Sequence, residues 1–397
     1  MRIVSGIIRR FAAVFAALLL SAGGAVRYYA GALPDHFFAE SGGSVSVPAL
    51  LPVTLHRCTD TVPQQAELRL FGMIPVKTVS VSAFQPASVY VGGEPFGIRM
   101  LMEGVMVVSL GDVRTGSGTV CPAKDAGIAV GDIILSVNGR AVRSNAEVQA
   151  AVSASDGAPV SVMLRRGDGH RTVTVQPAYA EAGHRWQTGM WVRDSTAGIG
   201  TVTYYMPSET GSIRFGGLGH AVCDADTGEQ IPLRSGEVVT VSVDEIVAGT
   251  AGKPGELRGS FDAETDAGTL LANTESGVYG ILHELPEKQI VLPLGSRQDI
   301  RRGDAWIYTT LHGIRPEAYS VVIEEIRGND SARRDLILRV TDERLLRETG
   351  GIVQGMSGSP IVQDGRLVGA VTHVFVRDPT RGYGIFAENM YADQIGF

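Results

Sequence analysis

A serine flanked by glycines carries the clearest chemical signal in the sequence. Ser357 stands between Gly355 and Gly358 and is followed by Pro360 and a short apolar run. A hydroxyl presented on such a turn can act as the nucleophile of acyl transfer when a base takes its proton. The glycines let the backbone fold close to a tetrahedral intermediate, so the N–H groups of Gly355 and Ser357 are the predicted oxyanion hole. The alternative is an ordinary glycine–serine turn of a β protein.

A histidine is the usual base for such a serine, and the sequence has eight. His220 is the predicted base because it ends a strand-like run in a glycine-rich setting, far enough before Ser357 to come from a separate barrel. His373 is the rival. Its run, L-V-G-A-V-T-H, resembles the strand that lines the substrate cleft of chymotrypsin-like proteases, which predicts a role in specificity. The other six lie before, within or just after residues 94–178, or among polar turn residues.

A carboxylate normally holds the tautomer of the catalytic imidazole. Spacing alone does not choose among six aspartates, which are Asp224, Asp226, Asp244, Asp262, Asp266 and Asp342.

Composition narrows the class of protein. Fifty glycines and 7% aromatic residues in 397 favour short strands and tight turns, hence a mainly β fold. The net charge of −7, without a dense cluster of Lys or Arg, argues against a nucleic-acid partner. Cys58, Cys121 and Cys223 are far apart and form no metal-binding pair, and no H-E-x-x-H motif occurs, so neither a metal nor another cofactor is predicted.

The N-terminus carries an export signal. Arg9 and Arg10 precede an apolar run over 11–26, which is shorter than the roughly 20 residues of a spanning helix. Residues 1–32 are therefore predicted to be a signal peptide or a membrane anchor, with a buried N-terminal helix as the alternative. Residues 33–93 are predicted to be a linker and a small β-rich region.

Residues 94–178 resemble a PDZ domain. The run from Pro122 to Gly139, P-A-K-D-A-G-I-A-V-G-D-I-I-L-S-V-N-G, matches the helix, strand and hairpin of that family. The resemblance implies that the backbone N–H groups of Phe96, Gly97 and Ile98 hold a peptide carboxylate beside an exposed strand edge. Pro95 replaces a frequent glycine there, so an internal peptide segment is a rival ligand. A purely structural β domain is the alternative.

Residues 188–397 alternate between strands and turns over a length that suits two packed six-stranded barrels. The Ser357 turn resembles the way in which chymotrypsin-like proteases present their nucleophile. The predicted fold is thus mainly β, with a PDZ domain followed by a chymotrypsin-like double barrel.

The whole arrangement resembles one peptidase family. A PDZ domain, then Gly216-x-x-Gly219-His220, then the Ser357 turn and Thr372-His373 are similar to the stage IV sporulation protein B peptidases of endospore-forming bacteria. The resemblance implies a triad of His220, Asp342 and Ser357, in which Asp342 is identified only by matching the family's motif.

The resemblance also implies a function. Such a serine endopeptidase would process itself and cleave a membrane-bound regulator of an intramembrane metalloprotease, which triggers activation of a late sigma factor during sporulation. It would be exported to the space between the forespore membranes, tethered or secreted, and its PDZ domain would bind a ligand peptide. The alternative is a PDZ scaffold fused to an inactive protease-like barrel.

Overall fold

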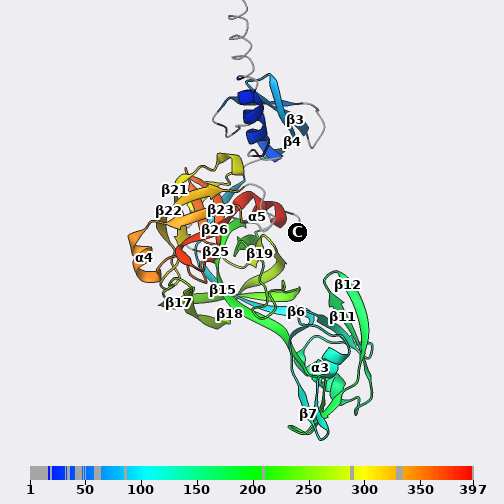
Figure 1. The fold of residues 1–397 in the computed structure, drawn as a ribbon. Coiled ribbons are helices and arrows are strands. Elements are labelled where there is room, and N and C mark those ends of the chain that lie inside the picture. The colour runs from blue at the N-terminus through cyan, green and yellow to red at the C-terminus, as the bar shows by residue number, and fades with distance from the viewer. Residues whose placement is uncertain are drawn as a thin grey trace, which may run out of the picture.

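The fold is built mainly from antiparallel strands. The computed structural model describes residues 17, 20–31, 33, 36–40, 47, 49, 51–57, 64–84, 87–207, 211–286, 290–327 and 334–395. Strands dominate these residues, which confirms the mainly β class predicted from the glycine content. Figure 1 shows a small N-terminal unit, a central body and a third unit at the end of two long strands.

The N-terminal unit is a helix over 20–31 packed on a four-stranded sheet. The sheet has the order β1 (His36–Glu40), β4 (Ile74–Phe84), β3 (Gln64–Leu70) and β2 (Val53–Arg57). Tyr29 of the helix is buried with Phe37 and Leu68 of the sheet. Half of the apolar run 11–26 lies outside the described residues. Among the described residues, no helix is long and apolar enough to cross a membrane.

Six strands of the central body close into a first barrel. They are β6 (Pro95–Leu110), β15 (Met190–Pro207), β16 (Ile213–Gly217), β17 (Leu233–Val247), β18 (Glu256–Thr274) and β19 (Gly277–Leu282). The pairing runs β6-β17-β18-β19-β16-β15, and β15 pairs with β6 to complete the circle. Phe96, Ile98, Phe215, Val238 and Leu270 fill its interior, all at most 4% exposed.

A second barrel follows in the chain. Its strands are β21 (Gly303–Thr309), β22 (Glu317–Ile326), β23 (Leu336–Val340), β24 (Pro360–Gln363), β25 (Arg366–Phe375) and β26 (Asp378–Phe386). They close in the order β21-β22-β23-β26-β25-β24. Helix α4 (Glu343–Thr349) follows β23, and α5 (Ala387–Gln394) follows β26. Ile307, Ile323, Leu338, Ile361 and Phe386 are fully buried inside.

The two barrels share one topology. When the strands of each barrel are numbered in chain order, both close in the circle 1-2-3-6-5-4. His220 lies on the connection from the third to the fourth strand of the first barrel, and Ser357 lies on the same connection of the second. The two residues therefore occupy corresponding places on two barrels.

Residues from both barrels build the core between them. Tyr204 and Tyr279 of the first barrel are buried with Leu367 and Ile385 of the second. Strands β5 (Ser88–Val91) and β20 (Ile290–Pro293) add to β15, and the 3-10 helix η1 (Arg297–Asp299) follows. This shared core fixes the loops that carry His220 and Ser357 relative to each other.

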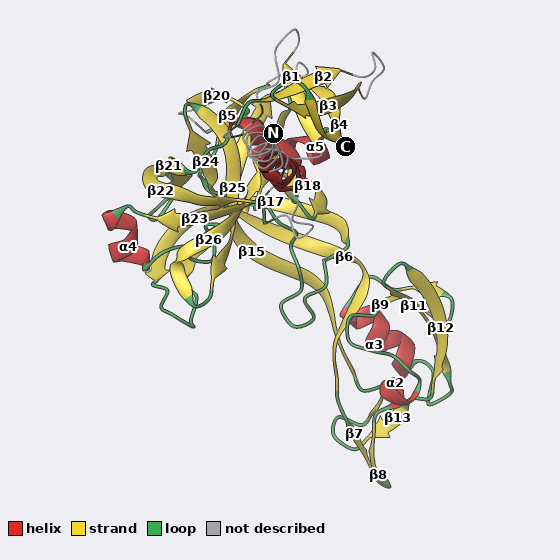
Figure 2. Cartoon of the chain, turned by 45° about the horizontal axis from the view of Figure 1, so that its top comes forward, coloured by secondary structure: helices red, strands yellow, loops and turns green. Residues whose placement is uncertain are grey.

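The third unit is inserted into the first barrel, between its first and second strands. It contains β7 (Val113–Thr115), β8 (Gly118–Val120), α2 (Pro122–Asp125), β9 (Ile133–Val137), β10 (Arg140–Ala141), α3 (Asn145–Ser153), β11 (Val160–Arg166), β12 (Gly169–Val175), β13 (Ala178–Ala180) and β14 (Arg185–Gln187). Strands β6 and β15 run out of the body into it, as Figure 2 shows. Val107, Ile134, Val148 and Leu164 are buried in its core.

The PDZ-like motif forms the elements that it predicts. Pro122 begins α2, and Ser144 caps α3 by accepting a hydrogen bond from the backbone of Glu147. Asp132 is 1% exposed and is paired with Arg166, with 2.6 Å between its Oδ1 and the Arg166 Nε. The aspartate of the motif therefore holds this unit together.

The structure corrects the role of residues 94–102, which the sequence assigned to the PDZ domain. Phe96, Gly97 and Ile98 pair with Gly200, Ile199 and Gly198 of β15 on one side and with β17 on the other. Their backbone is thus part of the first barrel and does not form a carboxylate-binding turn. A Cβ on Gly97 would lie 2.6 Å from the Phe261 ring, so this glycine allows the partly exposed Phe261 ring to pack directly on β6.

We predict that the fragment 184–397, which lacks β6, does not fold. Losing β6 exposes the partners of Phe96, Ile98, Met100 and Met102, each at most 4% exposed. At about 1.5–3 kcal/mol per side chain this is roughly 6–12 kcal/mol, as much as the whole stability of a typical domain. The fragment 87–397 is the control, and circular dichroism during urea unfolding is the measurement. A cooperative transition in the shorter fragment would contradict the shared-strand architecture.

Candidate active site

The Ser357 turn needs glycine at two positions. Gly355 and Gly358 have φ of 99° and 96°, which L side chains rarely adopt. A Cβ on Gly358 would lie 2.0 Å from the Thr201 carbonyl oxygen and 2.5 Å from the Leu218 nitrogen. The turn is therefore pressed against the first barrel at backbone distance.

Strand β15 holds this turn with three hydrogen bonds. The Thr201 N–H donates to the Ser357 carbonyl oxygen at 2.9 Å, and the Thr201 hydroxyl donates to the Gly355 carbonyl oxygen at 2.8 Å. The Thr203 hydroxyl donates to the Gly358 carbonyl oxygen at 2.7 Å. A strand of the first barrel thus fixes the Ser357 loop of the second, and no local pattern in the sequence indicates this role for either threonine.

The predicted oxyanion hole is free. Within the described chain, the N–H groups of Gly355 and Ser357 donate no hydrogen bond, whereas Met356 donates to Val353 and Ser359 donates to Met356. Two unengaged N–H groups flanking a nucleophile can stabilise the negative oxygen of a tetrahedral intermediate.

His220 lies on a turn with unusual backbone angles. Leu218 and Gly219, which precede it, have φ of 65° and 70°. A left-handed leucine costs conformational energy and is found mainly where packing enforces it, often at functional sites. The strain at Leu218 turns the chain at the end of β16, so His220 points back toward the second barrel, where its ring meets that of His373.

The tautomer of His220 follows from its hydrogen bond. Its Nδ1 lies 2.8 Å from the carbonyl oxygen of Ala221. A carbonyl only accepts, so Nδ1 carries the proton and the Nε2 lone pair is available to take another. Burial lowers the pKa of His220, although the bond to Ala221 opposes that effect. The ring is a neutral base at physiological pH.

His373 of β25 stacks on His220. The ring centroids are 4.5 Å apart and the planes are tilted by 35°. Burial, the His220 ring and the charge of Arg334 together lower the pKa of His373 to about 4. Two neutral imidazoles thus lie side by side at the junction of the barrels.

The Ser357 hydroxyl is in a resting conformation. It donates to the carbonyl oxygen of Thr372 at 2.6 Å, and no hydrogen bond joins it to His220 in the part of the chain that is described. Because Thr372 precedes His373 in β25, the nucleophile and the histidine pair meet at this point of the strand. The Ser357 hydroxyl must leave Thr372 before a base can take its proton.

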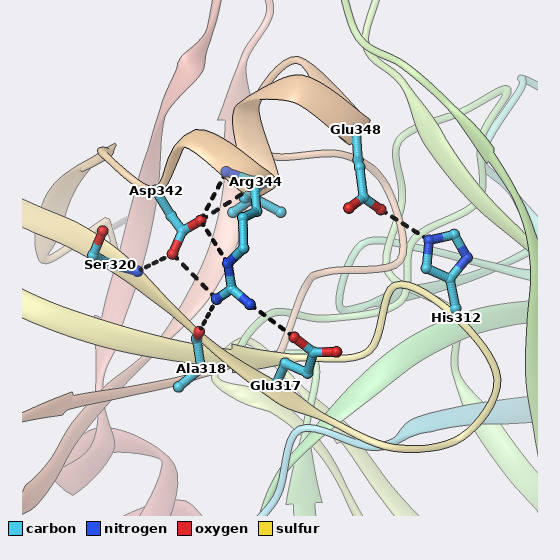
Figure 3. Close-up of polar contacts among 8 residues, drawn as sticks. His312, Glu317, Ala318, Ser320, Asp342, Arg344 and Glu348 are labelled. Atoms are coloured by element: carbon cyan, nitrogen blue, oxygen red, sulfur yellow. Dashed lines mark hydrogen bonds and ion pairs between the residues drawn. The ribbon is translucent and has the colours of Figure 1, made fainter.

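Asp342 lies at the start of α4, on the second barrel. Its carboxylate accepts from the N–H groups of Arg344 at 2.9 Å and Ser320 at 3.3 Å, and it is paired with the Arg344 guanidinium (Figure 3). Arg344 also reaches Glu317 at 3.0 Å. Burial alone would raise the pKa of Asp342, but these hydrogen bonds lower it below its usual value. The carboxylate caps a helix here.

Among the described residues, no carboxylate bonds to His220, and the Ala221 carbonyl occupies the Nδ1 position that a triad carboxylate would take. The assignment of Asp342 as the triad carboxylate therefore stays a prediction. His312 is paired with Glu348 at the surface, with 2.8 Å between Nε2 and the carboxylate oxygen, and Figure 3 shows this pair near Asp342. Of the other predicted aspartates, Asp224 and Asp226 bind Arg193.

Asn273 holds the loop that follows His220, and sequence reasoning missed it. Its Oδ1 accepts from the Val222 N–H at 2.8 Å, and its Nδ2 donates to the carbonyl oxygens of Val222 and Ile231, both at 2.9 Å. A lone asparagine on a strand carries no sequence signal for such a role.

The peptide groove of the inserted unit lies between α3 and the start of β15. A cleft of about 210 Å³ is lined there by Val148 and Gln149 of α3 and by Met190, Trp191 and Val192 of β15. Among the described strands, only β6 pairs with the stretch Met190–Arg193, which leaves its other edge open. An open strand edge beside a helix is where an extended peptide can add. Gly189, with φ of 80°, turns the chain into this strand.

Comparisons with known proteins divide the chain in the same way. A family model described as SpoIVB peptidase S55 matches residues 184–391, more than half of the chain, and a PDZ domain model matches 115–166. No curated protein matches the chain significantly. The PDZ domain of an SdrC-like protein from Listeria monocytogenes is 23% identical over 23% of this chain and 87% of its own, with a TM-score of 0.18. Neither family model includes residues 95–110, which form β6.

A capping role and a triad role of Asp342 predict different outcomes for Asp342→Asn. If Asp342 only caps α4, the rate at which a fluorophosphonate modifies Ser357 falls by less than tenfold. Asparagine caps helices as well as aspartate does, so α4 keeps its N-terminus. In a triad the same change lowers kcat by about 10⁴, because the histidine takes the wrong tautomer. A fall of that size would make Asp342 the triad carboxylate.

Because His373 is buried against His220 with a lowered pKa, we predict that the free energy of unfolding decreases in acid. Unfolded histidine titrates near 6.5, whereas the pKa of folded His373 is about 4. Between these values the unfolded chain binds more protons, so the free energy of unfolding decreases as the pH falls from 6.5 to 4. His373→Gln should flatten this dependence, measured as Tm against pH. Parallel curves for the two proteins would contradict it.

Proposed function

Because the chain belongs to the SpoIVB peptidase S55 family and is a serine peptidase, we propose that Ser357 is its nucleophile and His220 its general base. One observation carries this proposal: the two barrels bring Ser357 and the neutral, Nδ1-protonated His220 to the same point of β25. Ser357 reaches the Thr372 carbonyl, and His220 stacks on His373.

The proposed mechanism begins when a substrate enters and the Ser357 hydroxyl turns from Thr372 to His220. Nε2 of His220 takes the proton while Oγ attacks the peptide carbonyl carbon. The N–H groups of Gly355 and Ser357 hold the resulting oxyanion. His220 then gives its proton to the leaving amine, and a water molecule activated in the same way hydrolyses the acyl-enzyme. The Ala221 carbonyl keeps the imidazole in its working tautomer throughout.

The biological role that we propose is that of a sporulation endopeptidase. It processes itself and cleaves a membrane-associated regulator of an intramembrane metalloprotease, which leads to activation of a late sigma factor. The family name supports the link to sporulation. The PDZ domain supports recognition of a protein partner through an extended peptide segment. The apolar run before residue 27 supports export and attachment to a membrane on the outer side.

The resting hydroxyl supports tight control of this activity. A peptidase that triggers an irreversible step needs a state in which its nucleophile is not activated, and a Ser357 hydroxyl that donates to Thr372 is such a state.

We predict that Ser357→Ala abolishes self-processing of the full chain and fluorophosphonate labelling, with the fold retained. His220→Ala should lower the labelling rate by several orders of magnitude, since loss of a nucleophile or base costs on the order of 10⁶ in kcat. His373→Ala is the matched control and should lose far less. If only the His373 variant is inactive, the base has been assigned to the wrong histidine.

A further inference from the structure

Arg193 connects the peptide groove to the loop that carries the catalytic base. It follows Met190, Trp191 and Val192, the stretch of β15 that lines the groove. Its guanidinium is paired with the carboxylate of Asp224 and, at 2.7 Å, with that of Asp226. Both aspartates lie on the connection from β16 to β17, shortly after His220.

Asp224 shapes that connection. It is 2% exposed, and its Oδ1 accepts from the backbone N–H groups of Asp226 at 3.0 Å and Thr227 at 2.9 Å. Burial alone would raise its pKa, but the hydrogen bonds from Thr227, Arg193 and Asp226 lower it. A buried carboxylate of this kind depends on its cation, because an unpaired charge in that place would be strongly destabilising. Through this ion pair, a shift of Arg193 is expected to shift the loop that follows His220.

The strand is irregular on both sides of Arg193. The β15–β6 ladder shifts register between Trp191 and Val192 and again between Arg193 and Ser195. Such bulges re-aim a side chain and let a strand segment move without breaking the whole ladder. Beyond the second shift, the same strand reaches Thr201, which binds the Ser357 turn. A single strand thus contacts the groove, the base loop and the nucleophile loop.

We propose that Arg193 is a positioning residue that sets the placement of His220 according to whether the groove is occupied. A chain that adds to the open edge of Met190–Arg193 straightens this irregular segment, and Arg193 carries the change through Asp224 to the His220 loop. The two states differ in the acceptor of the Ser357 hydroxyl, which is Thr372 at rest and His220 when active. The inference rests on the proposed roles of Ser357 and His220.

The experiment fills the groove covalently in the full chain. Cys58→Ser and Cys223→Ser remove two native thiols and leave the buried Cys121. Gln149→Cys on α3 then places a thiol in the cleft for fluorescein maleimide. Fluorophosphonate labelling of Ser357 is timed before and after the modification. We expect the modification to raise the labelling rate at least ~5-fold, within the usual range of coupling between two sites.

The same measurement with Arg193 variants tests the link. The rise should fall below about 2-fold with Arg193→Ala and be partly restored with Arg193→Lys, which keeps a cation for Asp224. Arg99→Ala is the matched control, since Arg99 lies on the neighbouring strand β6 in an exposed pair with Glu237 at 3.4 Å, and it should keep the full rise. Thermal unfolding shows which variants are folded. If Arg193→Ala is not folded, the result with Arg193→Lys decides the test.

Contrary outcomes are distinct. The role of Arg193 is overturned if modification of the groove does not raise the labelling rate when Arg193 is present. It is also overturned if the Arg193→Ala protein shows an equal rise. Labelling that persists in Ser357→Ala overturns the assignment of the nucleophile and with it the proposed function.

Discussion

The active site depends on the contact between the Gly358 backbone and strand β15. A side chain at Gly358 would collide with the Thr201 carbonyl at 2.0 Å, so the nucleophile turn can approach the first barrel only because this position is glycine. Thr201 and Thr203 then donate to three carbonyl groups of the turn that would otherwise be buried without partners. Within the described chain, the N–H groups of Gly355 and Ser357 in this turn donate no hydrogen bond. The geometry of the candidate site thus arises between the barrels and belongs to neither of them alone.

Identical strand order explains why His220 and Ser357, the proposed base and nucleophile, lie at the same junction. Each barrel places one of them on the loop after its third strand, and a core shared by Tyr204, Tyr279, Leu367 and Ile385 fixes the two barrels together. The group that orients the imidazole of His220 does not come from a corresponding place on the second barrel. The Ala221 carbonyl orients His220, while Asp342 caps α4. A neutral acceptor stabilises an imidazolium less than a carboxylate does, which agrees with the proposed control of the activity.

Sequence reasoning succeeded where the signal was local. The mainly β class, the PDZ motif and the serine peptidase family follow from glycine content and from short runs of residues whose roles depend on their neighbours. It failed where a role is set by distant pairing. Phe96 to Ile98 stand next to the PDZ motif in sequence, yet β15 and β17 enclose them in the barrel. Asn273, Thr201 and Arg193 act through partners far along the chain, and no spacing rule identifies them.

The insertion of the PDZ unit between β6 and β15 has a consequence for how the chain folds. Gly198 pairs with Ile98, and bringing together the ends of so long a flexible loop costs roughly 4 kcal/mol of entropy before any contact offsets it. A PDZ unit that folds first removes this cost, because its own sheet already holds the far ends of β6 and β15 together. We therefore expect early folding of the inserted unit to speed closure of the first barrel, so that this unit acts as an internal template.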